Sequence, residues 1–218
     1  ESQTCAKRAI ALVNDTSQVL APGSVSVSDD GRLVSQSEFM PMLPEDEQLI
    51  NYGEDSTLSI VSTVERTSKI SKVELRWERR DGQPGRKLGG AKVTHDEEKR
   101  TTYTISNNSA DGPSTPLFIE HSADPSHEGY AIVTSERAVK TTTAFTRFRF
   151  VLAPQEEITF VVCERATHYS LRTSASQIKA LITADAFRDG GGADVLPAAA
   201  KTALAAMVAR AEQAAVLA

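Results

Sequence analysis

The sequence lacks most of the features that identify common enzymes and membrane proteins. Only 6% of its residues are aromatic, and its longest apolar runs fall far short of the roughly 18 residues of a membrane-spanning helix. It contains no Gly-x-Ser-x-Gly elbow, phosphate-binding glycine-rich loop, dinucleotide fingerprint or His-Glu-x-x-His zinc motif. These absences argue against the corresponding hydrolase, nucleotide-binding and zinc-protease chemistries, and no cofactor is predicted.

The two cysteines leave the cellular compartment open. Cys5 and Cys163 lie near opposite ends of the sequence and match no metal-ligand spacing. A disulfide between them requires the first and last strands to adjoin, and otherwise both are free thiols. Glu1 stands where an initiator methionine is expected, which predicts a processed terminus or a piece of a longer chain. Both a cytoplasmic location, which we favour, and a periplasmic one fit the sequence.

Composition and charge are typical of a soluble globular protein. Hydrophobic residues make up 40% and charged residues 24%, with a formal net charge of −5. A local basic excess runs from Lys72 to Arg100, where nine basic residues face six acidic ones. Because acids interrupt the bases and no aromatic platform accompanies them, we expect a solvated strand face and no nucleic-acid binding.

The clearest structural pattern lies between Ala144 and Arg165. Apolar residues alternate with polar ones on both sides of a turn at residues 153–156, which predicts an antiparallel hairpin with one buried face. The core is expected to hold Phe148, Phe150, Phe160 and Val162, and the outer face Arg147, Arg149 and Glu164.

Strand patterns fill the chain up to residue 173. Alternation is strict from Ile70 to Arg80, where Val73, Leu75 and Trp77 share a face that we expect to be buried. Residues 81–90 are rich in glycine and predict an exposed loop. Other strands are expected at residues 7–13, 24–28, 32–39, 47–52, 58–65, 99–107, 117–121 and 130–135. About ten strands without interleaved helices predict a mainly β protein, an antiparallel β-sandwich over residues 1–173.

Residues 174–218 change to helical patterns. Ser176 is expected to cap a first helix that runs to about Arg188 and ends before Gly190. An alanine-rich second helix is expected at residues 196–217, with an apolar stripe of Leu204, Met207, Val208 and Ala211. Because such a helix buries little area, it needs a partner. We therefore predict a helical appendage that begins a coiled-coil hairpin and binds a partner protein or a second copy.

Several segments follow the order found in one bacterial family. They are residues 9–27 (AIALVNDTSQVLAPGSVSV), 43–52 (LPEDEQLINY), 101–108 (TTYTISNN), 117–121 (LFIEH) and 148–164 (FRFVLAPQEEITFVVCE). Together they resemble the uncharacterised C-terminal β-rich domain of the bacterial mucoidy inhibitor A-like proteins, over roughly residues 8–170. The resemblance implies a β-rich domain attached to coiled-coil segments, without enzymatic activity or catalytic residues. Glu45 after Pro44 and the glycines of residues 81–90 depart from the family pattern.

The densest group of potential metal ligands lies between Glu120 and Glu128. Imidazole nitrogens and carboxylate oxygens suit zinc or a similar divalent ion. The candidate ligands are His121, Asp124, His127 and Glu128. Their spacing matches no familiar metal site, so a solvated surface loop is the competing interpretation. A smaller cluster, His95 to Glu98, is expected at a wet strand end.

Three functions remain open on the sequence alone. We favour a non-enzymatic structural or protein-interaction module. The first alternative is a metal-dependent hydrolase or metal-binding domain that uses the Glu120–Glu128 loop. The second is a carbohydrate-binding β-sandwich, in which exposed aromatic side chains stack on sugar rings; the expected burial of Trp77 argues against it.

Overall fold

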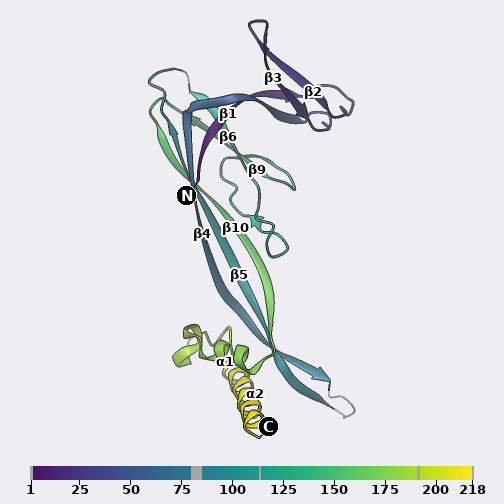
Figure 1. Cartoon of the computed structure of the whole chain (residues 1–218), viewed down its shortest axis with the longest axis vertical. Helices are drawn as coiled ribbons and strands as arrows, with labels where there is room; N and C mark the ends of the chain where they lie inside the picture. Colours follow the sequence, from purple (N-terminus) through teal and green to yellow (C-terminus); the bar gives the residue numbers. More distant parts are fainter. Residues whose placement is uncertain (1, 80–84, 113, 191, 218) are drawn as a thin grey trace.

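The computed structural model describes residues 2–79, 85–112, 114–190 and 192–217. This part of the chain forms ten strands in antiparallel sheets, followed by two α-helices, which confirms the predicted mainly β fold. The molecule is elongated, with the helices at one end and a strand pair at the other (Figure 1). No described helix is long and apolar enough to cross a lipid bilayer.

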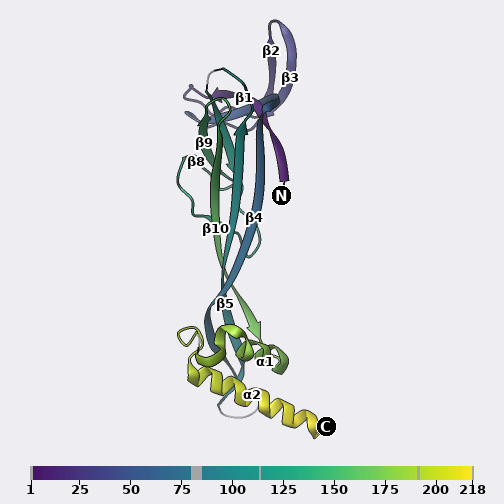
Figure 2. The same cartoon turned by 90° about the vertical axis from the view of Figure 1, so that its left-hand side faces the viewer.

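A five-stranded antiparallel sheet runs along most of the molecule. Its order is β1-β4-β5-β10-β7, with β1 at Ser2–Val13, β4 at Glu47–Arg79, β5 at Arg86–Asn107, β10 at Glu157–Arg172 and β7 at Ala131–Ile132. The strands β4, β5 and β10 continue from the upper end down to the helices (Figure 2). Because β1 and β10 are separated by β4 and β5, Cys5 and Cys163 do not meet, and both are free thiols.

A three-stranded sheet packs against the upper part of the long strands. Its order is β6-β9-β8, with β6 at Thr115–His121, β9 at Thr146–Leu152 and β8 at Ala138–Thr141. Between the two sheets lies a core, here called the sandwich core, of Ala6, Ile105, Leu117, Ile119, Phe148, Phe150, Leu152, Phe160 and Val162. The predicted core positions of Phe148, Phe150, Phe160 and Val162 are therefore confirmed.

The predicted hairpin between β9 and β10 does not form. β9 pairs with β6 and β8, whereas β10 pairs with β5 and β7, so the turn at residues 153–156 carries the chain from one sheet to the other. The two strands face each other through their side chains, and the rings of Phe148 and Phe160 lie 5.0 Å apart. An arch of this kind shows the same apolar alternation as a hairpin.

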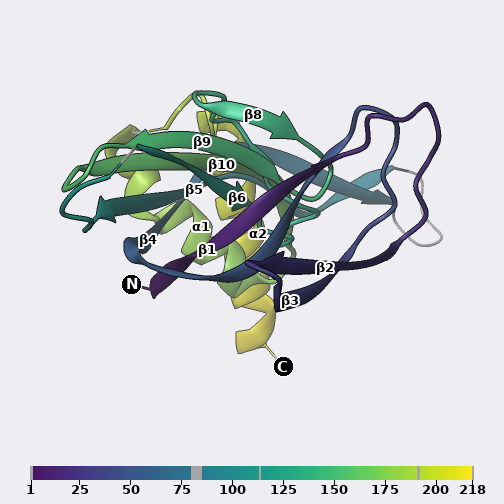
Figure 3. The same ribbon diagram turned by 90° about the horizontal axis from the view of Figure 1, so that it is seen from above.

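The strands β2, at Gly23–Asp29, and β3, at Arg32–Phe39, form a separate two-stranded sheet. Seen from above, this pair lies to one side of the stacked β6, β9 and β10 (Figure 3). The predicted turn at Asp30–Gly31 is present, and both residues have the positive φ that a tight hairpin requires (46° and 74°).

The helices pack on the lower ends of the long strands. α1 spans Ala175–Thr183, a 3-10 helix spans Asp185–Gly190, and α2 spans Ala198–Val216. Ser174, and not Ser176, is the N-cap of α1, because its hydroxyl accepts the backbone N–H of Gln177 in a capping box. The helical core consists of Val73, Ala91, Val93, Ile178, Leu181, Phe187, Leu196, Ala200, Leu204 and Val208.

The lower end of β4 corrects two predictions. The separate strands expected at residues 47–52, 58–65 and 70–80 form one continuous strand up to Arg79. Trp77, expected in the core, is 52% exposed, whereas Leu75, two residues earlier, packs against the helical core.

The glycine-rich segment 81–90 is only partly described, since residues 80–84 lie outside the described ranges. Residues 86–90 belong to β5 and not to a loop. A side chain at Gly90 would collide with the backbone carbonyl of Arg172, so this glycine lets the strands approach closely.

Candidate functional site

One face of the long sheet is polar in its middle and apolar at both ends. On β5 this face carries, from top to bottom, Ile105, Tyr103, Thr101, Lys99, Glu97, His95, Val93 and Ala91. Ile105 belongs to the sandwich core, and Val93 and Ala91 belong to the helical core. The β5 residues between these two cores, namely Tyr103, Thr101, Lys99, Glu97 and His95, form what we call the polar belt, together with the side chains that contact them from neighbouring segments.

Antiparallel register aligns the neighbouring strands with this belt. Lys99 lies opposite Glu164 of β10 and Arg66 of β4, and His95 lies opposite His168 of β10. Opposite residues of antiparallel strands point to the same face, so these side chains meet. A bulge at Ser71 of β4 then skips one residue, which keeps Val73 on this same face for the helical core.

The upper half of the belt is a buried ionic network centred on Glu164, which is 0% exposed. Its Oε1 atom lies 2.9 Å from Nζ of Lys99 and 2.9 Å from Nε2 of His121. Its Oε2 atom accepts the backbone N–H of Asp124 at 2.6 Å. On the other side of the imidazole, the hydroxyl of Tyr103 lies 2.7 Å from Nδ1 of His121.

Asp124 extends the network toward the surface. Its Oδ2 atom accepts a hydrogen bond of 2.7 Å from Arg66 and lies 3.4 Å from Nζ of Lys99. Its Oδ1 atom accepts both the backbone N–H and the hydroxyl of Ser126, at 2.9 and 2.6 Å. The carboxylate therefore joins the loop after β6 to the long sheet.

The protonation states follow from these contacts. The hydrogen bonds from Ser126, followed by the one from Arg66, hold the pKa of Asp124 far below its usual range. Burial by itself raises the pKa of Glu164, but the hydrogen bonds from the Asp124 N–H, Lys99 and His121 outweigh it and leave the pKa lowered. Burial, together with the charge of Glu164, raises the pKa of Tyr103 to about 12.

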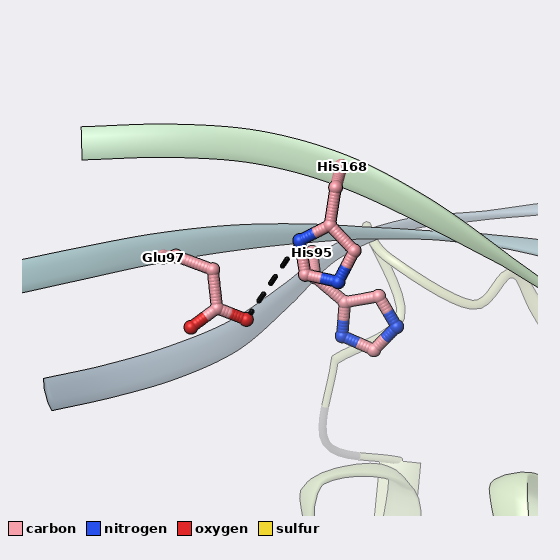
Figure 4. Close-up of side chains that lie close together, drawn as sticks. All are labelled: His95, Glu97 and His168. Carbon is pink, nitrogen blue, oxygen red and sulfur yellow. Dashed lines mark ion pairs between the residues drawn. The ribbon is translucent and has the colours of Figure 1, made fainter. Parts of the chain in front are cut away.

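The lower half of the belt is a stack of three imidazole rings. The rings of His95 and His168 lie 5.0 Å apart, and those of His168 and His127 lie 3.9 Å apart, each pair within 9° of parallel. The carboxylate of Glu97 approaches the stack from the same strand as His95, with Oε1 3.9 Å from Nδ1 of His168 (Figure 4). Burial and then the neighbouring His168 lower the pKa of His95, so its ring is neutral at neutral pH.

The four predicted metal ligands separate into three environments. His121 and Asp124 both bind Glu164 in the ionic network. His127 stacks on His168 instead, and the Glu128 side chain is exposed. Among the described residues, the group close enough to share a metal ion is His95, Glu97 and His168, whose ligand atoms all lie within 4.8 Å of one another.

Sequence reasoning missed Glu164, Lys99 and His168. Glu164 was expected on the outer face, yet it has the same parity on its strand as Phe160 and Val162 and is therefore buried. Lys99 has the same parity on β5 as the buried Ile105, and this pattern in the sequence places Lys99 on the inner face.

Arg147, also expected to be exposed, is only 4% exposed. Two of its guanidinium nitrogens donate to Glu120 at 3.0 and 2.7 Å, and a third donates to Glu47. It lies on the outer face of its sheet, as its parity predicts, but the rings of Phe118 and Phe145 cover it.

The exposed aromatic side chains of the described residues do not form a common platform. Trp77 and Tyr169 are 52% and 61% exposed. Trp77 shares the face of Val73, whereas Tyr169 lies on the opposite face, where Lys92 covers its ring at 4.4 Å. A sugar ring cannot stack on both at once, which gives the carbohydrate-binding alternative no support.

A groove of about 840 Å³ opens between the two sheets at their free edges. β1 is an edge strand of the long sheet and β6 is an edge strand of the short one. The floor carries apolar side chains of both sheets, namely Ala6, Leu49, Leu58, Ile60, Leu117 and Ile119.

No protein-family model, curated protein or solved structure matches this chain.

Proposed function

We propose that this chain is a non-enzymatic protein-interaction module that binds an extended segment of a partner protein in the groove between β1 and β6. The observation that carries the proposal is the groove itself, which lies between two strand edges that have no further strand partner in the described part of the chain. Unpaired edges offer backbone N–H and C=O groups to an added strand.

The lining of the groove suits an extended peptide. Every second residue of an extended segment points to the same side, so apolar side chains can enter the floor beside Leu58 and Ile60. Lys7 and Arg8 of β1 also line the groove, and their positive charges are placed to fix the direction of the segment. We therefore expect a ligand with alternating apolar residues.

The polar belt favours a structural role over hydrolysis. Both carboxylates of its ionic network, Glu164 and Asp124, are engaged by hydrogen bonds and cations of the chain itself. His121 is held between Glu164 and Tyr103 through both ring nitrogens. A general base or metal ligand needs a free lone pair, so we rank the hydrolase alternative at the Glu120–Glu128 loop lower.

Cys5 provides a test of the groove, because it is exposed and lies in the groove lining. In a Cys163→Ser background, peptides selected from a random displayed library should bind the protein, and a bulky maleimide on Cys5 should weaken binding more than about tenfold.

The matched control moves the thiol away from the groove. In a Cys5→Ser, Cys163→Ser, Ser26→Cys variant the same maleimide sits on β2, and binding should be retained. Peptides that bind equally well with Cys5 blocked would contradict the proposal.

The exposed end of α2 offers a second interaction surface. Its buried residues are Ala200, Leu204 and Val208, and every described residue beyond Val208 is exposed. A shallow hollow there is lined by Ala209, Glu212, Gln213, Val216 and Leu217. We infer that a second copy docks along this face, in keeping with the coiled-coil attachment that the mucoidy inhibitor A-like resemblance implies.

Sedimentation velocity tests this self-association. The wild-type chain should show a concentration-dependent dimer, and Ala209→Arg should abolish it by placing a charge in the contact. Ala211→Arg, on the opposite face of the helix, is the control and should leave the dimer intact. A monomer at all concentrations of the wild type would rule out the second copy as the occupant.

A further inference from the structure

We propose that His95, Glu97 and His168 form a binding site for one divalent transition-metal ion, with Zn²⁺ as the best match. The site is separate from the groove and does not depend on the proposed function. It is also distinct from the ligand set that the sequence predicted in the Glu120–Glu128 loop, of which only His127 touches it.

The backbone already brings the three side chains together. His95 and His168 lie directly opposite each other on paired antiparallel strands, and Glu97 follows His95 by two residues on the same face. Their ligand atoms lie within 4.8 Å of one another, and the Glu97 Oε1 to His168 Nδ1 distance is 3.9 Å. The strand β5 is anchored in the helical core at one end and in the sandwich core at the other, and β10, which pairs with it along this stretch, is anchored in the sandwich core.

The donor set is one that transition metals prefer. Two imidazole nitrogens and one carboxylate oxygen, with a water in the remaining position, make an open four-coordinate zinc site. With metal–ligand distances of about 2.1 Å, tetrahedral ligand atoms stand about 3.4 Å apart, so modest side-chain rotations bring these groups into range.

The Nδ1 atom of His168 is the second observation that points to a ligand. It is buried and makes no hydrogen bond to the described residues. Buried polar atoms are nearly always satisfied, so an atom of this kind calls for an explanation such as an ion. It lies on the side of the ring that faces Glu97, where the bound ion would satisfy it (Figure 4).

Neighbouring groups orient the ligands. The hydroxyl of Ser68 donates to Oε1 of Glu97 at 2.7 Å, and the hydroxyl of Ser170 lies 3.0 Å from Nε2 of His95. Hydrogen bonds of this kind fix the side-chain orientation in metal sites. His127 packs on the ring of His168 and shields it without belonging to the ligand group.

Titration calorimetry of the full chain with Zn²⁺ tests the site. The experiment uses a Cys5→Ser, Cys163→Ser background, which removes thiolate ligands. We expect one Zn²⁺ per chain, visible d–d absorption when Co²⁺ replaces it, and a rise in Tm with added Zn²⁺. His168→Gln and Glu97→Gln should each lower the association constant by more than about 100-fold, since loss of a ligand costs more than loss of an orienting neighbour.

His127→Gln is the matched control, because it removes an imidazole from the same stack but none from the ligand group. It should change the association constant less than about tenfold, while circular dichroism and Tm without metal report whether each variant is folded. Glu97→Gln preserves shape and keeps the test valid if His168→Gln does not fold. Absence of Zn²⁺ binding to the parent, or equal binding by the parent and Glu97→Gln, would overturn the proposal.

Discussion

Glu164 is the fully buried carboxylate at the centre of the ionic network. Both of its oxygens are engaged, one by Lys99 and His121 and the other by the backbone of Asp124. A charge at this depth is tolerated only when paired and hydrogen-bonded, because its desolvation is otherwise unfavourable by several kcal/mol. The network therefore holds the loop after β6 against β5 and β10.

Glu164→Gln should destabilise the protein by about 3 kcal/mol, as measured by urea unfolding at neutral pH. Removal of one partner from a buried pair typically costs about 3–5 kcal/mol, and the lower end applies here because Asp124 still lies 3.4 Å from Lys99. The pKa of Glu164 is lowered in the folded state, so its contribution is present above the unfolded value of about 4.3 and is lost as pH falls below it. The loss of stability that protonation of Glu164 causes at low pH should therefore be absent from the Glu164→Gln variant.

Glu98→Gln is the matched control for that experiment. Glu98 makes ion pairs with Arg100 and Arg165 on the outer face of the same two strands, and both arginine side chains are more than half exposed. Exposed pairs contribute little to stability, so Glu98→Gln should destabilise the protein far less than Glu164→Gln. Equal losses in the two variants would show that burial does not strengthen the Glu164 network.

At the scale of elements, the arch between β9 and β10 shows what an alternating sequence pattern predicts and what it does not. Alternation correctly identified both strands and their apolar faces, because these depend on local sequence alone. It could not distinguish pairing within one sheet from facing across two sheets, since both bury the same side chains. The choice depends on distant partners, β6 for β9 and β5 for β10.

The long strand β4 shows a second limit of local patterns. Its polar stretches at residues 53–57 and 66–69 predicted breaks, yet β4 is one strand from Glu47 to Arg79. The bulge at Ser71 changes which residues face inward, and a strict period of two cannot anticipate it.

At the scale of the whole molecule, two cores lie at separate positions on the same strands. Val93 of the helical core and Ile105 of the sandwich core are twelve residues apart on β5, about 40 Å of strand. The polar belt occupies the length between them. The division into a sandwich at 1–173 and a helical appendage at 174–218 remains a prediction, although both segments contribute side chains to the helical core.

Paired substitutions in the two cores test that division. Leu204→Ala and Phe148→Ala remove fully buried side chains from the helical and sandwich cores, and should cost about 2–5 and 3–5 kcal/mol. Because β4 and β5 contribute side chains to both cores, we expect one calorimetric transition that each variant lowers. The destabilisation of the double variant should equal the sum of the two single losses within about 0.5 kcal/mol. Two transitions, each responding to one substitution, would instead support two independent domains.

The sequence by itself determined the fold class, most strand positions, the two helices and the apolar faces of the sandwich, because alternation, capping and turn chemistry are local. Only the tertiary structure decided which strands pair and that Glu164 and Lys99 meet inside. It also decided that His95 and His168, distant in sequence, lie opposite each other. Register between distant strands sets these encounters, and no local pattern encodes it.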